Sequence, residues 1–199
     1  MRTLVYLCFV IFITSCETGK KSAPLEYIYA EKKQVINCEN QNNALLNEAL
    51  YSFENDIIKK YDRDAQRVAY AYANFIMPGI TGTVDFERLA SDHSKKILQK
   101  LIEEEIIIPN VGTKSNLNYT HPAVSCIIDA SEDTAIKQTL ESLIKVGGMD
   151  PSLFDTRLVN KGPDLYTQRN LALYVALDAY YQNLADVDFS DDDVEIEKK

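Results

Sequence analysis

Residues 164–185 read DLYTQRNLALYVALDAYYQNLA and form the most apolar of the helices that the sequence predicts. Apolar side chains recur every three or four positions, which places them on one face of an α-helix. Further apolar residues widen this face until it covers most of the circumference. A helix of this kind needs neighbours on several sides, so we expect it at the centre of a bundle. The regular stripe consists of Leu173, Ala176, Leu177, Tyr180, Tyr181 and Leu184, and it is widened by Leu171, Tyr174 and Val175.

The same periodicity predicts helices along most of the chain before this segment. A long helix is expected from about Asn43 to Tyr61, since its apolar residues recur every three or four positions. A second helix is expected to stop at Pro78-Gly79, because proline cannot continue the hydrogen-bond ladder and glycine supplies the turn. We therefore predict an all-α fold, a single domain built as an irregular bundle of about six to eight helices. Start signals of further helices lie at Asp85, Pro122, Ser131–Asp133 and Asp150–Pro151.

The N-terminus carries a different pattern. An uncharged apolar stretch covers residues 4–13, which suits the core of a signal peptide and is shorter than the roughly 20 residues that a permanent membrane span needs. The stretch ends in Ile13-Thr14-Ser15-Cys16, an aliphatic residue and two small residues before a cysteine. This motif resembles the lipobox of bacterial lipoproteins, and the resemblance covers only residues 1–16. The alternative is a short core helix, which would show polar positions at helical spacing, and residues 4–13 have none.

The resemblance implies a cellular location for the chain. In lipoproteins the signal is cut before the cysteine, and acyl chains such as palmitate on that residue hold the protein stably on a membrane. Here that residue would be Cys16. An aspartate after the cysteine retains enteric lipoproteins at the inner membrane, whereas Glu17 follows here, which implies the outer membrane of a bacterial cell envelope. The predicted divisions are a signal peptide (1–15), a tether (16–34), a helical domain (35–185) and an acidic disordered tail (186–199). The alternative for the end of the tether is that Tyr27, Ile28, Tyr29 and Val35-Ile36 pack on the domain as an extended lead-in.

Composition and charge limit the classes of partner. The chain is 46% hydrophobic and 26% charged, which is typical of a globular protein, and its formal net charge is −9. Basic residues are scattered and form no patch interleaved with aromatic residues, so nucleic-acid binding is not expected. The partners that we predict are a membrane, through the acylated Cys16, and another protein of the envelope.

The acidic tail admits two interpretations. Its simplest role is a disordered, solvating segment that could dock on a basic partner. Asp186, Asp188, Ser190 and Glu197 fall at positions 1, 3, 5 and 12 of a calcium-loop template, but Asp191 stands where that loop needs glycine. A true EF-hand is therefore not expected, whereas loose association with divalent cations stays an alternative.

The cysteines divide into two groups. Cys8 would leave with the signal peptide and Cys16 would be lipidated, so Cys38 and Cys126 remain as a pair in a compartment that can be oxidising. We predict a disulfide between them, and two buried free thiols are the alternative. Such a bond would close a long loop and stabilise the fold by about 3–5 kcal/mol in the chain-entropy model.

Few residues offer catalytic chemistry. The two histidines, His93 and His121, stand in no metal-binding arrangement, and we predict no metal site and no cofactor. His93 is interpreted as a solvated surface residue. His121 with Cys126 would make a nucleophile pair, but the disulfide explains that cysteine better. Asp178 is either a buried general acid or an ordinary helix residue that faces solvent or Arg169.

The sequence as a whole favours a non-catalytic role. We predict a lipid-anchored envelope lipoprotein whose domain acts as a binding or interaction module, and we assign no catalytic residues. One alternative is an envelope hydrolase that uses carboxylates such as Asp178. The other is a protein that binds a small ligand or divalent cations, with the acidic tail as the cation site.

Overall fold

The computed structural model describes residues 24–62, 67–109, 115–147 and 155–189. The predicted signal peptide, Cys16 and residues 190–199 of the predicted tail lie outside these ranges. Within them the chain is all-α, which confirms the predicted fold class, and the one β-type pairing is an isolated antiparallel bridge between Ile107 and Leu117. None of the helices in this part of the chain is long and apolar enough to cross a membrane.

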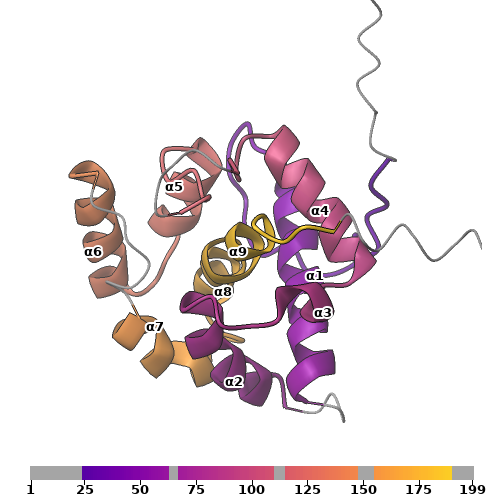
Figure 1. Ribbon diagram of the computed structural model, residues 1–199. Coiled ribbons are helices and arrows are strands. Elements are labelled where there is room, and N and C mark those ends of the chain that lie inside the picture. The colour runs from indigo at the N-terminus through magenta and orange to yellow at the C-terminus, as the bar shows by residue number, and fades with distance from the viewer. Residues whose placement is uncertain (1–23, 63–66, 110–114, 148–154, 190–199) are drawn as a thin grey trace, which may run out of the picture.

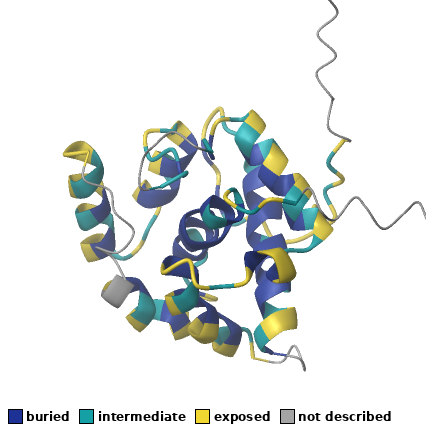
Figure 2. Ribbon diagram, viewed as in Figure 1, coloured by how far each residue is buried: buried dark blue, intermediate teal, exposed yellow. Residues whose placement is uncertain are grey.

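A single unbroken helix occupies the centre of the bundle. It consists of α8 (Arg169–Val175), a π-helical segment η3 (Ala176–Tyr181) and α9 (Gln182–Leu184). Every residue from 171 to 182 is buried, so Figure 2 shows this helix dark blue around its circumference. The predicted start at residue 164 is wrong, because Gly162–Asp164 winds as a 3-10 helix and Gln168 has a non-helical backbone.

The first half of the chain surrounds one side of the central helix (Figure 1). The longest element is α1 (Asn43–Tyr61), which packs against α2 (Val68–Ile80), α4 (Asp92–Glu103) and the central helix, and the short α3 (Phe86–Leu89) contacts α9. Side chains of residues that precede the helices cap them, because their oxygens accept backbone N–H groups of the first turn. These caps are Asn42 for α1, Asp85 for α3 and Ser91 for α4.

The second helix differs from its predicted end. It continues through Pro78 to Ile80, so the proline lies inside the last turn. The backbone carbonyls near this end are hydrogen-bonded. The N–H of Thr81 donates to the carbonyl of Met77, and the N–H of Thr83 donates to the carbonyl of Pro78. Proline therefore removes one donor near the helix end without breaking the turn. Gly79 is needed there for space, because a Cβ would lie 2.5 Å from the ring of Phe75.

The second half covers the other side of the central helix. α5 (Pro122–Asp129) packs on α8, and α6 (Thr134–Lys145) lies outside α5 at the edge of the molecule (Figure 1). α7 (Asp155–Lys161) leads through η2 (Gly162–Asp164) along α2. The start signal predicted at Asp150–Pro151 lies outside the described residues.

A disulfide and the packed segment before α1, residues 24–42, hold the beginning of the domain in place, and this segment is called the lead-in below. Cys38 is bonded to Cys126, 88 residues further along, with their Cα atoms 5.9 Å apart. The bond ties the segment before α1 to α5. Residues 24–34, which the sequence assigned to the tether, lie against the domain, since Glu48 of α1 accepts the N–H groups of Ile28 and Tyr29. The ordered body therefore begins about ten residues earlier than position 35.

Candidate functional site

The helix α1 carries an unusual row of polar residues into the interior. Glu48, Ser52 and Asp56 are spaced four residues apart, so they share one face of α1, and all three are buried. Glu54 is also buried, on another face. Buried carboxylates need partners, because removing an ionised group from water without hydrogen bonds costs several kcal/mol. The partners of each acid therefore decide whether it is free for chemistry.

Asp56 is satisfied at the point where α4 begins. Its Oδ2 accepts the N–H and the hydroxyl of Ser91, both at 3.1 Å, the hydroxyl of Ser94 at 2.6 Å and that of Tyr180 at 2.7 Å. Ser94 also bonds Ser52 at 2.7 Å. The carboxylate faces the N-terminus of α4, where the helix dipole favours negative charge. Burial and this neighbouring carboxylate together raise the pKa of Tyr180 well above its ordinary value.

Glu54 holds the start of the central helix. Its carboxylate forms a bidentate ion pair with both terminal nitrogens of Arg169. It also accepts a hydrogen bond from the hydroxyl of Tyr72 at 2.6 Å. The guanidinium of Arg169 also lies over the ring of Tyr51, 5.1 Å from its centre. Burial alone would lower the pKa of Arg169, but the hydrogen bonds and charge of Glu54 raise it above its ordinary value. This arginine is therefore a fixed structural cation.

Glu48 and His93 contact each other and the lead-in. The imidazole Nε2 of His93 lies 2.6 Å from Oε1 of Glu48, and the same carboxylate accepts the N–H groups of Ile28 and Tyr29. The His93 ring packs edge-on against Tyr29. The interpretation of His93 as a solvated surface residue is wrong, because α4 turns it toward the buried acid on α1. The spacing of single residues on one helix could not reveal this neighbour.

Asp178 lies in the π-helical segment of the central helix. Its side chain is buried and accepts the hydroxyl of Tyr119, from the loop before α5, so it faces neither solvent nor Arg169. Burial and the charge of Asp178 raise the pKa of Tyr174 well above its ordinary value. The side-chain amide of Gln182 donates a hydrogen bond to the backbone carbonyl of Asp178. Because π segments often occur at functional sites, this carboxylate is the strongest acid candidate of the chain, yet it is enclosed by packed side chains.

The other proposed reactive pair does not assemble. Nδ1 of His121 accepts the N–H of Ala123 at 3.1 Å, so this ring caps the start of α5. The sulfur of Cys126 is bonded to Cys38 and has no thiol to activate. A nucleophile pair of His121 with Cys126 is therefore ruled out in this oxidised form.

The described part of the acidic segment makes ordinary surface contacts. Asp186 accepts the side-chain amide of Asn116 at 2.7 Å and, with Asp85 and Glu87, lines a cavity near the end of the central helix. Within the described ranges no cluster of three or more histidine, cysteine, aspartate or glutamate side chains is arranged to hold a metal ion. Ser190, Asp191 and Glu197 of the calcium-loop template lie outside those ranges.

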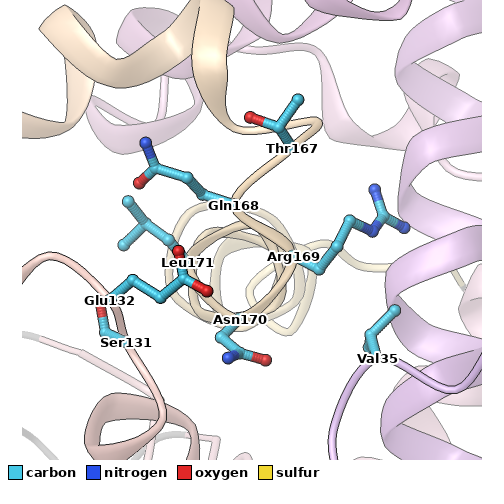
Figure 3. A pocket seen from close by; sticks show the side chains of 8 residues that line it. All are labelled: Val35, Ser131, Glu132, Thr167, Gln168, Arg169, Asn170 and Leu171. Carbon is cyan, nitrogen blue, oxygen red and sulfur yellow. The ribbon is translucent and has the colours of Figure 1, made fainter.

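A polar cavity opens at the other end of the central helix. Figure 3 looks nearly along the helix axis, with Arg169 on one side, Ser131 and Glu132 on the other and Asn170 between them. Its volume is about 190 Å³. Three separate parts of the chain form it: the lead-in, the turn between α5 and α6, and the start of α8. The lining residues are Val35, Ser131, Glu132, Thr167, Gln168, Arg169, Asn170 and Leu171.

Two residues that line this cavity each carry a buried oxygen with no hydrogen-bond partner. These oxygens are Oγ of Ser131 and Oδ1 of Asn170. The amide nitrogen of Asn170 donates to the carbonyl of Ala130 at 2.7 Å, which fixes the orientation of that amide and leaves Oδ1 as the unused end. Buried polar atoms nearly always find a partner in proteins. Both oxygens are enclosed by neighbouring protein atoms, so they do not face the space of the cavity.

The central helix begins beside the same cavity. The cap residue Gln168 makes no side-chain bond to the first turn. The first N–H groups of a helix lack partners within the helix. The sequence did not identify this site. Its predicted helix began at residue 164, which placed Asn170 inside the helix instead of at its entrance, and no pattern linked Asn170 to Ser131.

No family model, no curated protein and no solved structure matches the chain.

Proposed function

We propose that the protein is a lipid-anchored component of the bacterial cell envelope whose helical domain binds another envelope component without catalysing a reaction. The lipobox resemblance of Ile13-Thr14-Ser15-Cys16 supports the anchor. One observation carries the non-catalytic role: the buried carboxylates of α1 are committed to holding the fold. Glu48, Glu54 and Asp56 each accept several hydrogen bonds from neighbouring elements.

The packed lead-in sets how far the domain would stand from the membrane. Leu25 already packs against the core. Leu25 follows Cys16 by nine positions. An extended chain spans at most about 3.5 Å per residue, so the distance between these two residues is at most about 30 Å. A tether that ran to residue 34 would reach about twice as far. The proposed partner therefore lies close to the membrane surface that carries the anchor.

The lipid anchor is tested by metabolic labelling with a palmitate analogue in a bacterial host. We expect the full chain to incorporate the label and to fractionate with membranes. The Cys16→Ser variant should lose both properties. Cys8→Ser is the matched control, since that cysteine leaves with the signal, and it should keep both. Labelling that survives Cys16→Ser would contradict the anchor.

The binding role is tested by chemical cross-linking of the anchored chain in intact envelopes, followed by purification. We expect one partner in stoichiometric amount. The unanchored Cys16→Ser chain should lose this partner, because the membrane no longer brings the two together. Deletion of residues 186–199 tests whether the acidic segment forms the contact. Recovery of the anchored chain alone, with efficient cross-linking of a known envelope complex in the same sample, would contradict the proposal.

A further inference from the structure

We propose that the outward face of α2 is the interface through which two copies of this chain pair about a two-fold axis. The face lies at the lower edge of the molecule in Figure 1, apart from the described start of the lead-in. The inference goes beyond the proposed function and rests on the folded domain alone, so its failure would leave the lipid anchor and the envelope partner as they stand.

The outward face of α2 exposes apolar side chains and carries no charge. Residues 68–84 form the longest uncharged run in the described ranges, in a chain of which 26% is charged. Tyr70 and Met77 stand seven positions apart, close to two helical turns, so they share one face. Their exposed fractions are 46% and 47%. Apolar side chains that gather on one exposed face mark an interaction site, whereas single ones need no explanation.

The centre of this face allows a second helix to approach closely. Ala73 and Asn74 occupy it, and both are exposed. The side-chain amide of Asn74 donates to the carbonyl of Tyr70 at 2.8 Å, so it lies along the helix. When α2 of a second copy crosses here in the opposite direction, Tyr70 of each copy faces Met77 of the other. A methionine sulfur and an aromatic ring attract each other.

The end of this face at the start of α2 is basic. Lys59 and Lys60 occupy the last turn of α1, which leads into α2, and both are exposed. The guanidinium of Arg67 lies over the ring of Tyr70, 4.6 Å from the ring centre. Its charge is offset by Asp62, 3.8 Å away. The two lysines therefore supply the positive charge at this end.

The opposite end of this face is acidic. Three exposed acids line a cavity of about 370 Å³ that begins at Gly82, two positions after α2. Arg88 offsets only one of them, Asp85, at 3.5 Å, so the cavity keeps a negative charge. It has room for a lysine side chain of another copy. The three acids are Asp85, Glu87 and Asp186.

These features favour a second copy over a lipid surface. In a two-fold pair both copies use the same patch, so that patch must be complementary to itself. Here an uncharged centre lies between a basic and an acidic end. A crossing in opposite directions sets each basic end against the acidic end of the other copy. An anionic lipid surface would attract the first end and repel the second.

The first test is sedimentation of the full chain in a density-matched detergent. We expect a protein mass of about twice that of one chain. Met77→Glu puts a charge into the centre of the interface and should weaken pairing at least about tenfold. Val146→Glu is the matched control, since Val146 at the end of α6 is 75% exposed, and it should keep the dimer. A monomeric parent, or a dimer that is insensitive to Met77→Glu, would overturn the proposal.

Cysteine cross-linking tests the direction of the crossing. Asn74→Cys lies next to the axis and should form a disulfide dimer on mild oxidation. Tyr70→Cys should not pair with itself, because its two copies lie about 10 Å apart along the helices, but it should pair with Met77→Cys. Ser142→Cys, exposed on α6, is the control and should form no dimer. Self-pairing of Tyr70→Cys would overturn the arrangement.

The same Asn74→Cys chain distinguishes a lipid surface from a second copy. If the thiol forms no dimer and is shielded from a water-soluble maleimide only on vesicles of phosphatidylethanolamine and phosphatidylglycerol, lipid covers this face and the proposal is overturned.

Charge reversal tests the two ends. Lys60→Glu and Glu87→Lys should each weaken pairing roughly threefold, because each sets like charges against one another. The double variant restores opposite charges between copies and should recover the affinity of the parent. Sedimentation measures all three, and a double variant that recovers nothing would overturn the predicted contact between the ends.

Discussion

At the scale of single residues, Asp56 is a buried carboxylate that depends on hydrogen bonds from several elements. One of its oxygens receives four donors from α4 and the central helix, and no cation is among them. A buried carboxylate can be held by hydrogen bonds alone when enough donors converge on it. This acid therefore connects α1, α4 and the central helix at one point. Its loss would strand several donors at once.

Replacement of Asp56 tests this connection. We expect Asp56→Ala to lower the free energy of unfolding by about 3–5 kcal/mol, because it leaves the N–H of Ser91 and the hydroxyl of Tyr180 buried without an acceptor. Asp56→Asn keeps an acceptor oxygen and should cost clearly less. Urea denaturation measures both. Asp92→Asn is the control, since that side chain is 93% exposed, and it should change stability by no more than about 0.5 kcal/mol. Equal stability of the Ala variant and the parent would contradict the role of Asp56.

Residue roles were the part of the site that the sequence predicted least well. The sequence showed that Asp178 stands in an apolar helix, but not that Tyr119 would meet it there. It showed a histidine in a polar stretch, but not that Glu48 would lie 2.6 Å from it. Both errors have one cause. A helical pattern fixes which face a residue occupies, whereas its partner comes from another element far away in the sequence.

At the scale of elements, most helices were predictable because their signals are local. The start of α1 at Asn43 and the caps Asp85 and Asp133 lie within a few residues of the turns that they stabilise. The π-helical segment was not predictable. Its sequence keeps a helical spacing of apolar residues, and the Gln182 side chain donates to the backbone carbonyl of Asp178 in the same helix. Such a segment leaves no signature in the periodicity of a single chain.

The outer helix α6 offers a test of a local cap. Oδ1 of Asp133 accepts the N–H of Ile136, and Oδ2 lies 2.9 Å from Nζ of Lys161 at the end of α7. We expect Asp133→Ala to cost about 1–2 kcal/mol, because it removes cap and ion pair together. Asp133→Asn keeps the cap and should cost about 0.5 kcal/mol, since the pair is partly exposed to solvent. Thermal and urea denaturation of both variants measure the difference, and equal losses would show that the cap contributes nothing.

Asp133 should also make the stability of the fold depend on pH in the acidic range. Hydrogen bonds from Lys161 and from the N–H of Ile136 lower its pKa in the folded state. Its contribution is therefore complete at neutral pH and is lost as the pH falls below about 4 toward the lower folded-state value. The stability difference between the parent and Asp133→Ala should shrink over this acidic range. A difference that stays constant down to the folded-state value would contradict the lowered pKa.

At the scale of the whole molecule, the arrangement joins segments that the sequence separates widely. The cavity at the start of α8 needs the lead-in, the α5–α6 turn and the central helix in one place, so no local pattern could predict it. The all-α class and the central position of the last helix could be predicted, because a helix that is apolar on most of its circumference must be surrounded. The disulfide between Cys38 and Cys126 holds two of these segments together.

Removal of this disulfide tests its share of the total stability. The bond closes a loop across a sequence separation of 88, and the chain-entropy model gives about 4–5 kcal/mol for a loop of that size. We expect the double variant Cys38→Ala with Cys126→Ala to lose about this much in urea denaturation. The parent measured with a reductant should approach the double variant, and the double variant should not respond to reductant. A parent that is equally stable with and without reductant would contradict the contribution.

The tyrosines make the domain sensitive to alkali. Burial raises the pKa of Tyr72, Tyr174, Tyr180 and Tyr181 well above the ordinary value, so each stays neutral in the folded state where the unfolded chain would ionise it. Their contribution is complete below about pH 10 and is lost as the pH rises toward the folded-state values. Each group adds about 1.4 kcal/mol per pH unit to this loss.

We therefore expect the free energy of unfolding to fall steeply above about pH 10, with several protons released on unfolding. Urea denaturation across this range gives the slope, and the ultraviolet absorbance of tyrosinate should rise together with the loss of helical circular dichroism. Tyr181→Phe removes one titrating group and should lower the slope by about 1.4 kcal/mol per pH unit, at the cost of its bond to the Ala49 carbonyl. If the buried tyrosines ionised while the helices stayed intact, the packing around the central helix would be far looser than the structure requires.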